Sequence, residues 1–147
     1  MISCRDGQAN LPLRELRKTG DTMTHSARFV KVVEEARSRV REVSVEEVHR
    51  RLAEQEPFHL VDVRERQEWE AGRLPGAVHL SKGVIERDVE RTIAETNAPI
   101  VLYCGGGYRS ALAAENLQRM GYTNVASMAG GYRAWEQAQL PTQPPDA

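Results

Sequence analysis

The chain has 147 residues, which suits a single domain because compact domains usually take roughly 100 to 200 residues. Its 20 Lys and Arg residues nearly balance its 21 Asp and Glu residues, which excludes a general electrostatic attraction to nucleic acid or to an anionic membrane surface. No apolar run approaches the roughly 20 residues of a membrane helix, and the first residues lack the apolar segment of a secretion signal. We therefore expect a cytoplasmic protein that binds neither nucleic acid nor membrane.

The N-terminal part is predicted to be a loose tail followed by a helix. Residues 1–22 show no sustained periodicity, whereas apolar residues then recur at helical spacing and predict an amphipathic helix within residues 23–41. A helix of this kind could dock on the domain or on a second copy of the chain, so residues 26–41 are a candidate homodimer contact. The apolar face consists of Phe29, Val32, Val33, Ala36 and Val40.

Strands and helices are predicted to alternate over residues 42–140. Ser44 followed by Glu47 forms a capping box that predicts the start of a helix running to about residue 55. This alternation favours a parallel sheet covered by helices on both faces, an α/β fold, and residues 141–147 are expected to be disordered. The predicted strands are 58–63, 77–80, 100–103 and 125–128, and the later predicted helices are about 82–94, 109–121 and 131–140.

Cys104 follows the strand at 100–103, where ligands of parallel sheets usually bind. Behind it stand Gly105, Gly106 and Gly107, and Arg109 lies where the next helix begins. Glycines allow successive backbone N–H groups to turn inward as a nest, and the start of a helix adds unpaired N–H groups. Such donors favour a thiolate over a thiol. The loop therefore predicts a nucleophilic cysteine, the alternative being a buried cysteine that only ends a strand.

The loop resembles the active loop of the rhodanese-like domain family, which has the form C-x-x-G-x-R-S. Two further stretches resemble the family, Asp62-Val63-Arg64-Glu65 followed by Leu74-Pro75-Gly76, and Gly130-Gly131 with Trp135. The resemblance covers about residues 42–140. It implies a five-stranded parallel sheet with helices on both faces, preceded here by the N-terminal helix. It also implies a sulfurtransferase whose cysteine carries a transferable sulfur as a persulfide.

The resemblance also implies roles for the residues of the loop. Cys104 would attack the outer sulfur of thiosulfate or another small anionic donor and pass that sulfur to cyanide, a thiol or a protein acceptor. Arg109 would bind the anionic donor and Ser110 would donate a hydrogen bond to the sulfur. No cofactor is expected besides the covalent persulfide. The expected substrate-binding residues are Gly105, Gly106, Gly107, Tyr108, Arg109 and Ser110.

Other polar residues are expected to support the loops. Asp62 and Arg64 are expected to form a buried ion pair, although a pair facing the substrate is the alternative. His79 could move protons, but an ionised thiol needs no base, so a structural role is expected. No metal is predicted, because the histidines and the two cysteines lack the spacing of metal ligands.

Two alternative functions also use a reactive cysteine close to an arginine. Cysteine-dependent phosphatases and arsenate reductases pair a thiolate with an arginine at the spacing C-x-x-x-x-x-R, whereas only four residues separate Cys104 from Arg109 here. The shorter loop suits one added sulfur better than a phosphate. A sulfur carrier or docking module without turnover of its own, acting with a partner protein, would need the same loop and could use the N-terminal extension for docking.

Overall fold

The computed structural model describes residues 25–145 of the chain. The tail predicted for residues 1–22 lies outside the described residues. Val32 begins a compact unit that contains all the described strands, and the fold below is the fold of that unit. None of the helices within the described residues is long and apolar enough to cross a bilayer.

The described chain contains the predicted helices and strands in the predicted order, together with one strand, at Arg41–Val43, that the sequence does not predict. The charged segment before Gly72 is a helix as well, and each predicted strand or helix has an observed counterpart. The elements are α2 (Ala27–Arg37), β1 (Arg41–Val43), α3 (Val45–Ala53), β2 (His59–Asp62), α4 (Arg66–Ala71), β3 (Val78–His79), α5 (Ile85–Thr92), β4 (Ile100–Tyr103), α6 (Tyr108–Arg119), β5 (Val125–Met128) and α7 (Gly131–Gln137).

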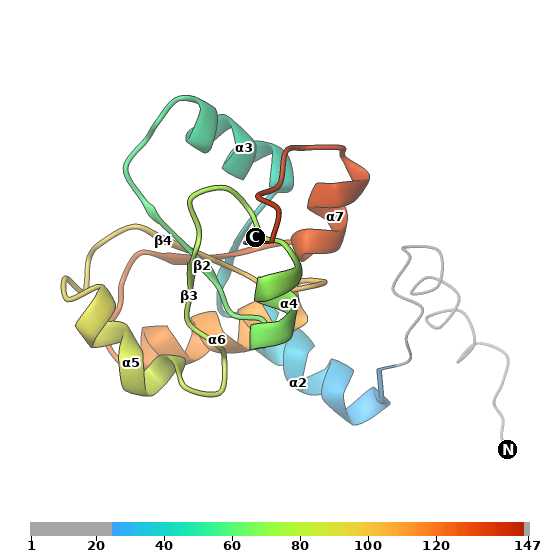
Figure 1. The fold of residues 1–147 in the computed structure, drawn as a ribbon. Coiled ribbons are helices and arrows are strands. Elements are labelled where there is room, and N and C mark those ends of the chain that lie inside the picture. Colours follow the sequence, from blue (N-terminus) through green and yellow to red (C-terminus); the bar gives the residue numbers. More distant parts are fainter. Residues whose placement is uncertain (1–24, 146–147) are drawn as a thin grey trace, which may run out of the picture. The chain divides into compact units, whose positions relative to one another are not determined.

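The five strands form one sheet in the order β1-β5-β4-β2-β3, and every pair of neighbours is parallel. Helices α3 and α7 lie on one side of the sheet and α5 and α6 on the other (Figure 1). Alternate residues along the strands enter two separate cores: Leu60 and Val101 pack with Trp135 beneath α3 and α7, whereas Val61 and Leu102 pack beneath α5 and α6. The predicted α/β fold class is confirmed.

The edge strand β1 corrects the predicted helical range 23–41. Helix α2 ends at Arg37, and Arg41 already pairs with Ala126 of β5. The strand has three residues, none of them fully buried, so its side chains carry no alternating apolar signal, and its position depends on hydrogen bonds to β5. Val32, which is expected on the apolar face of the helix, is 51% exposed. A homodimer contact through residues 26–41 stays a prediction.

The C-terminal segment corrects a second expectation, that residues 141–147 are disordered. Gln143 forms an isolated antiparallel bridge with Arg73, in which the Gln143 N–H donates to the Arg73 carbonyl at 2.7 Å. The indole N–H of Trp135 donates to the Pro141 carbonyl at 2.9 Å. Because backbone groups of this segment satisfy partners in the domain, residues 141–143 form part of the fold.

Candidate functional site

Cys104 lies directly after β4, buried at the carboxyl edge of the sheet and 1% exposed. The chain turns there into α6 through Gly107, which has a left-handed φ of +94°. A Cβ atom at that position would lie 3.0 Å from the Gly130 nitrogen. Glycine is therefore required at position 107 both for the backbone angle and for the close approach of the chain near α7.

Two backbone amides point at the sulfur of Cys104. The Gly107 N–H donates to Sγ at 3.1 Å, and the Ser110 N–H, in the first turn of α6, donates at 3.3 Å. Because these donors stabilise negative charge on sulfur, they form a small anion cradle around it.

A pair of buried hydroxyl groups extends from the sulfur into the sheet. Sγ of Cys104 lies 3.6 Å from Oγ of Ser110, and that oxygen lies 2.8 Å from Oγ of Ser127 on β5. Both serines are fully buried. The sequence reasoning missed Ser127, although a serine inside the apolar run Val125–Met128 was a signal for a buried polar contact.

Arg109, which is expected to bind the anionic donor, forms an ion pair with Glu68. Its Nη1 and Nη2 atoms donate to the two carboxylate oxygens of Glu68 at 2.9 and 3.2 Å. This guanidinium holds the pKa of Glu68 below its usual range. Sequence reasoning missed Glu68, whose side chain also accepts from the Glu65 N–H in the capping box of α4. The ion pair places a carboxylate at the rim of the loop, on the side of Arg109.

Helix α7 packs its first turn directly on the backbone of the active loop. The Tyr132 N–H donates to the Cys104 carbonyl at 2.8 Å, and the Arg133 N–H donates to the Gly105 carbonyl at 3.0 Å. A Cβ atom on Gly131 would lie 2.5 Å from the Cys104 carbonyl oxygen. Glycine at position 131 therefore allows the helix to approach closely enough for these two hydrogen bonds.

Asp62 and Arg64 form the buried ion pair that the sequence predicts at the end of strand β2. Nη2 of Arg64 lies 2.7 Å from Oδ2 of Asp62 and donates to the Gly72 carbonyl at 2.6 Å. Oδ2 of Asp62 also accepts from the Tyr103 hydroxyl at 2.7 Å. Burial, with the nearby Asp62 charge, raises the pKa of Tyr103. The network anchors the residue immediately before Cys104.

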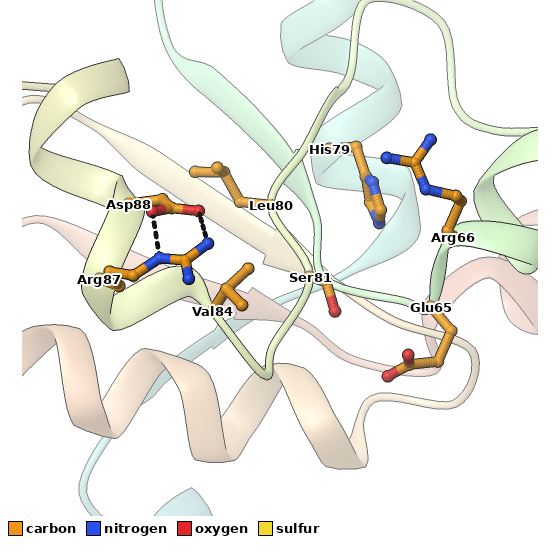
Figure 2. Close-up of a pocket in the computed structure, with 8 residues that line it drawn as sticks. All are labelled: Glu65, Arg66, His79, Leu80, Ser81, Val84, Arg87 and Asp88. Carbon is orange, nitrogen blue, oxygen red and sulfur yellow. Dashed lines mark hydrogen bonds and ion pairs between the residues drawn. The ribbon is translucent and has the colours of Figure 1, made fainter.

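His79 lies in a neighbouring pocket. Its Nε2 donates to the Arg64 carbonyl at 2.7 Å, and its ring stacks on Trp69 with the ring centroids 5.1 Å apart. Figure 2 shows His79 together with Glu65 and Arg66 in this pocket, and none of the lining residues belongs to the Cys104 loop. The arrangement gives His79 a supporting contact to the backbone of Arg64. Within residues 25–145, no three His, Cys, Asp or Glu side chains gather as metal ligands.

Comparison with known proteins places this geometry in a family. The sequence pattern of the family described as "Rhodanese-like domain" matches residues 44–138. The chain is 31% identical over 120 residues to "Putative sulfur carrier protein YrkF" of Bacillus subtilis, a match that covers 82% of this chain and 58% of that protein. It thus spans less than two thirds of the length of YrkF. It is 34% identical over 92 residues to "Thiosulfate sulfurtransferase GlpE" of Vibrio cholerae, covering 63% of this chain and 85% of that protein.

A solved structure from Rhodopseudomonas palustris has a closely similar fold. That protein, described as "Protein of Unknown Function RPA3614, Possible Tyrosine Phosphatase", superposes with a TM-score of 0.73 at 28% identity, covering 82% of this chain and 98% of that chain. The likeness therefore extends over most of the fold described above. With the family pattern over residues 44–138 and this fold, the chain belongs to the rhodanese-like family.

Proposed function

We propose that the protein is a sulfurtransferase that moves a sulfane sulfur from thiosulfate or a related anionic donor to cyanide or a thiol through a persulfide on Cys104. The observation that carries the proposal is the pair of amides on the sulfur, from Gly107 at 3.1 Å and Ser110 at 3.3 Å. The similarity to GlpE, a thiosulfate sulfurtransferase by name, supports it.

In the first half-reaction, the Cys104 thiolate attacks the outer sulfur of thiosulfate. A sulfur–sulfur bond forms between the cysteine and that atom while the sulfur–sulfur bond within thiosulfate breaks. Sulfite leaves with the electron pair of the broken bond, so the total charge is unchanged. The negative charge of the product lies on the terminal persulfide sulfur, where N–H donors of the loop stabilise it in the manner of an oxyanion hole.

In the second half-reaction, cyanide attacks the terminal sulfur. Thiocyanate forms, and the electron pair of the persulfide bond returns to the Cys104 sulfur, which regenerates the thiolate without a proton, an oxidant or a reductant. A thiolate acceptor would take the sulfur in the same way and become a persulfide. The cycle predicts ping-pong kinetics through a covalent intermediate.

Intact mass spectrometry tests the covalent step. After incubation of the full chain with thiosulfate, we expect one added sulfur that disappears on addition of cyanide. The added sulfur should be absent in Cys104→Ala and present in Cys4→Ala, which removes the other cysteine of the chain. Sulfur that persists in Cys104→Ala would refute the assignment of the nucleophile.

A sulfur carrier is the second candidate, because the YrkF match covers 82% of this chain. A carrier would accept one sulfur and release it to a partner protein, with little cyanide-dependent turnover. Steady-state formation of thiocyanate separates the two functions: sustained turnover supports the enzyme, and a single equivalent of thiocyanate per chain supports the carrier. The comparison of the full chain with residues 41–147 then tests whether the N-terminal extension contributes to the reaction.

The loop geometry argues against a phosphatase, the activity that the name given to RPA3614 suggests for that protein. Only four residues lie between Cys104 and Arg109, one fewer than in the phosphatase spacing, and this shorter loop suits one added sulfur better than a tetrahedral phosphate. We expect turnover of thiosulfate and none of p-nitrophenyl phosphate. The opposite preference would overturn the proposed function.

A further inference from the structure

Two guanidinium groups fill the space above the glycines of the active loop. A Cβ atom on Gly105 would lie 3.1 Å from Nη2 of Arg109, and a Cβ atom on Gly106 would lie 3.1 Å from Nη1 of Arg133. The loop itself offers no side chain at positions 105 and 106. The polar groups next to the mouth of the loop therefore come from arginines of α6 and α7.

The two arginines differ in how their charge is balanced. Arg109 donates with both Nη atoms to Glu68 and forms a compensated ion pair. Arg133 is exposed, and none of the carboxylates in the described part of the chain forms an ion pair with it. Its guanidinium therefore presents an uncompensated positive charge over the loop, with all its N–H donors available to a ligand.

The position of Arg133 is fixed relative to the nucleophile through the backbone. Its N–H donates to the Gly105 carbonyl at 3.0 Å, and the N–H of the preceding Tyr132 donates to the Cys104 carbonyl at 2.8 Å. A Cβ atom on Gly131 would lie 2.5 Å from this carbonyl oxygen, so glycine allows α7 to approach the loop this closely. Arg133 belongs to helix α7, yet its backbone is hydrogen-bonded to the loop that carries the reactive sulfur.

From this geometry we infer that Arg133 is a specificity-determining residue that binds the anionic end of the sulfur donor, the sulfonate group in the case of thiosulfate. The inference rests on the proposed function and names its substrate class. A guanidinium matches the paired oxygens of a sulfonate or carboxylate with two parallel hydrogen bonds. Glu68 compensates the charge of Arg109 on that side of the loop, so the donor lies toward the uncompensated Arg133 while its outer sulfur meets Cys104.

Steady-state kinetics of Arg133→Met test the inference on the proposed reaction. The variant keeps a long side chain and loses the charge, so we expect the KM for thiosulfate to rise about tenfold with kcat changed less than about twofold, because the lost contact binds the donor without acting on the breaking bond. Arg133→Lys should recover part of the loss. Arg119→Met is the matched control, an exposed arginine at the far end of α6, and should leave both constants unchanged.

Alkylation of Cys104 supplies a test that needs no sulfur transfer. Iodoacetate and iodoacetamide react at the same sulfur and differ in charge. We measure both rates on the Cys104 peptide by mass spectrometry and take the iodoacetate rate divided by the iodoacetamide rate. This ratio should fall about fivefold to tenfold in Arg133→Met, because the anionic reagent loses the attraction of the guanidinium, and should stay unchanged in Arg119→Met. An unchanged ratio and KM in Arg133→Met would refute the role of Arg133 while the sulfurtransferase stands. A wild-type chain that takes no sulfur from thiosulfate would refute the function, yet the alkylation ratio would still report on the cation.

Discussion

Substitution of Gly131 by alanine tests how closely α7 must approach the active loop. Gly131 has a φ of +61°, and an added Cβ would lie 2.5 Å from the Cys104 carbonyl oxygen and 2.7 Å from the Gly105 carbonyl carbon. Both neighbours are backbone atoms, which cannot rotate away as a side chain would. To relieve the overlap, α7 and the loop have to separate, and the two hydrogen bonds between them have to lengthen.

The expected cost has two parts that a second glycine separates. Gly76 has a φ of +79°, and an added Cβ there meets no atom within 4 Å. Gly76→Ala should therefore cost only the left-handed backbone angle, about 1 to 2 kcal/mol in the free energy of unfolding. Gly131→Ala should cost this amount plus about 1 to 3 kcal/mol for the overlap, a total of about 2 to 5 kcal/mol.

Urea denaturation of both variants at one temperature measures these free energies of unfolding, and cyanide-dependent turnover at a temperature where both are folded measures the effect on the loop. We expect Gly131→Ala to be the less stable variant and to lose most of its turnover, while Gly76→Ala keeps wild-type turnover. Equal stabilities, or equal turnover per folded molecule, would show that the contact between α7 and the loop does not constrain the nucleophile.

Three further substitutions test the charges and hydroxyl groups around the site. Arg64→Met leaves the buried carboxylate of Asp62 without its cation and should cost about 3 to 5 kcal/mol in unfolding free energy. Arg66→Met is the control, because the side chains of its ion pair are 78% and 59% exposed, and it should cost less than about 1 kcal/mol. Equal costs would contradict the stabilising role of the buried pair. Because Arg109 lowers the pKa of Glu68 in the folded protein, this ion pair contributes stability above the ordinary pKa of 4.5, and the contribution is lost as the pH falls through the pKa of the folded state. The difference in unfolding free energy between the wild type and Glu68→Gln should therefore shrink between pH 7 and pH 3 in urea titrations. A constant difference would argue against the ion pair. Ser127→Ala removes the hydroxyl that orients Ser110 and should slow the alkylation of Cys104 by iodoacetamide about threefold. Ser127→Thr keeps a hydroxyl and should keep the wild-type rate. A wild-type rate in Ser127→Ala would mean that the hydroxyl pair does not act on the sulfur.

Local patterns predicted those parts of the site that are continuous in sequence. The strand before Cys104, the glycines behind it and the helix after them each have a local signal, and the structure brings them together in one turn. Glu68 and Arg133 carry no such signal, because their roles depend on how α4 and α7 pack around the edge of the sheet. Glu68 stands 41 residues before Arg109, and only the fold brings the two charges into contact.

The edge of the sheet illustrates the same limit for the fold. Strand β1 has three residues and pairs with β5, its parallel neighbour, through backbone groups. Its side chains are exposed or half-buried, so neither alternation nor an apolar run marks it. The segment that binds Arg73 at the C-terminus is similar, since Gln143 uses main-chain atoms that any residue except proline possesses.

The hydrogen bonds from α7 to the loop carbonyls offer a way to observe the nucleophile without modifying it. The amide protons of Tyr132 and Arg133 each donate to a carbonyl in or next to Cys104. Any event that shifts this turn, such as loading of a sulfur atom or its removal, changes the length of these bonds and therefore the chemical shifts and exchange rates of the two protons. The amide resonances of Tyr132 and Arg133 on α7 therefore report whether Cys104 is charged and whether it carries an added sulfur.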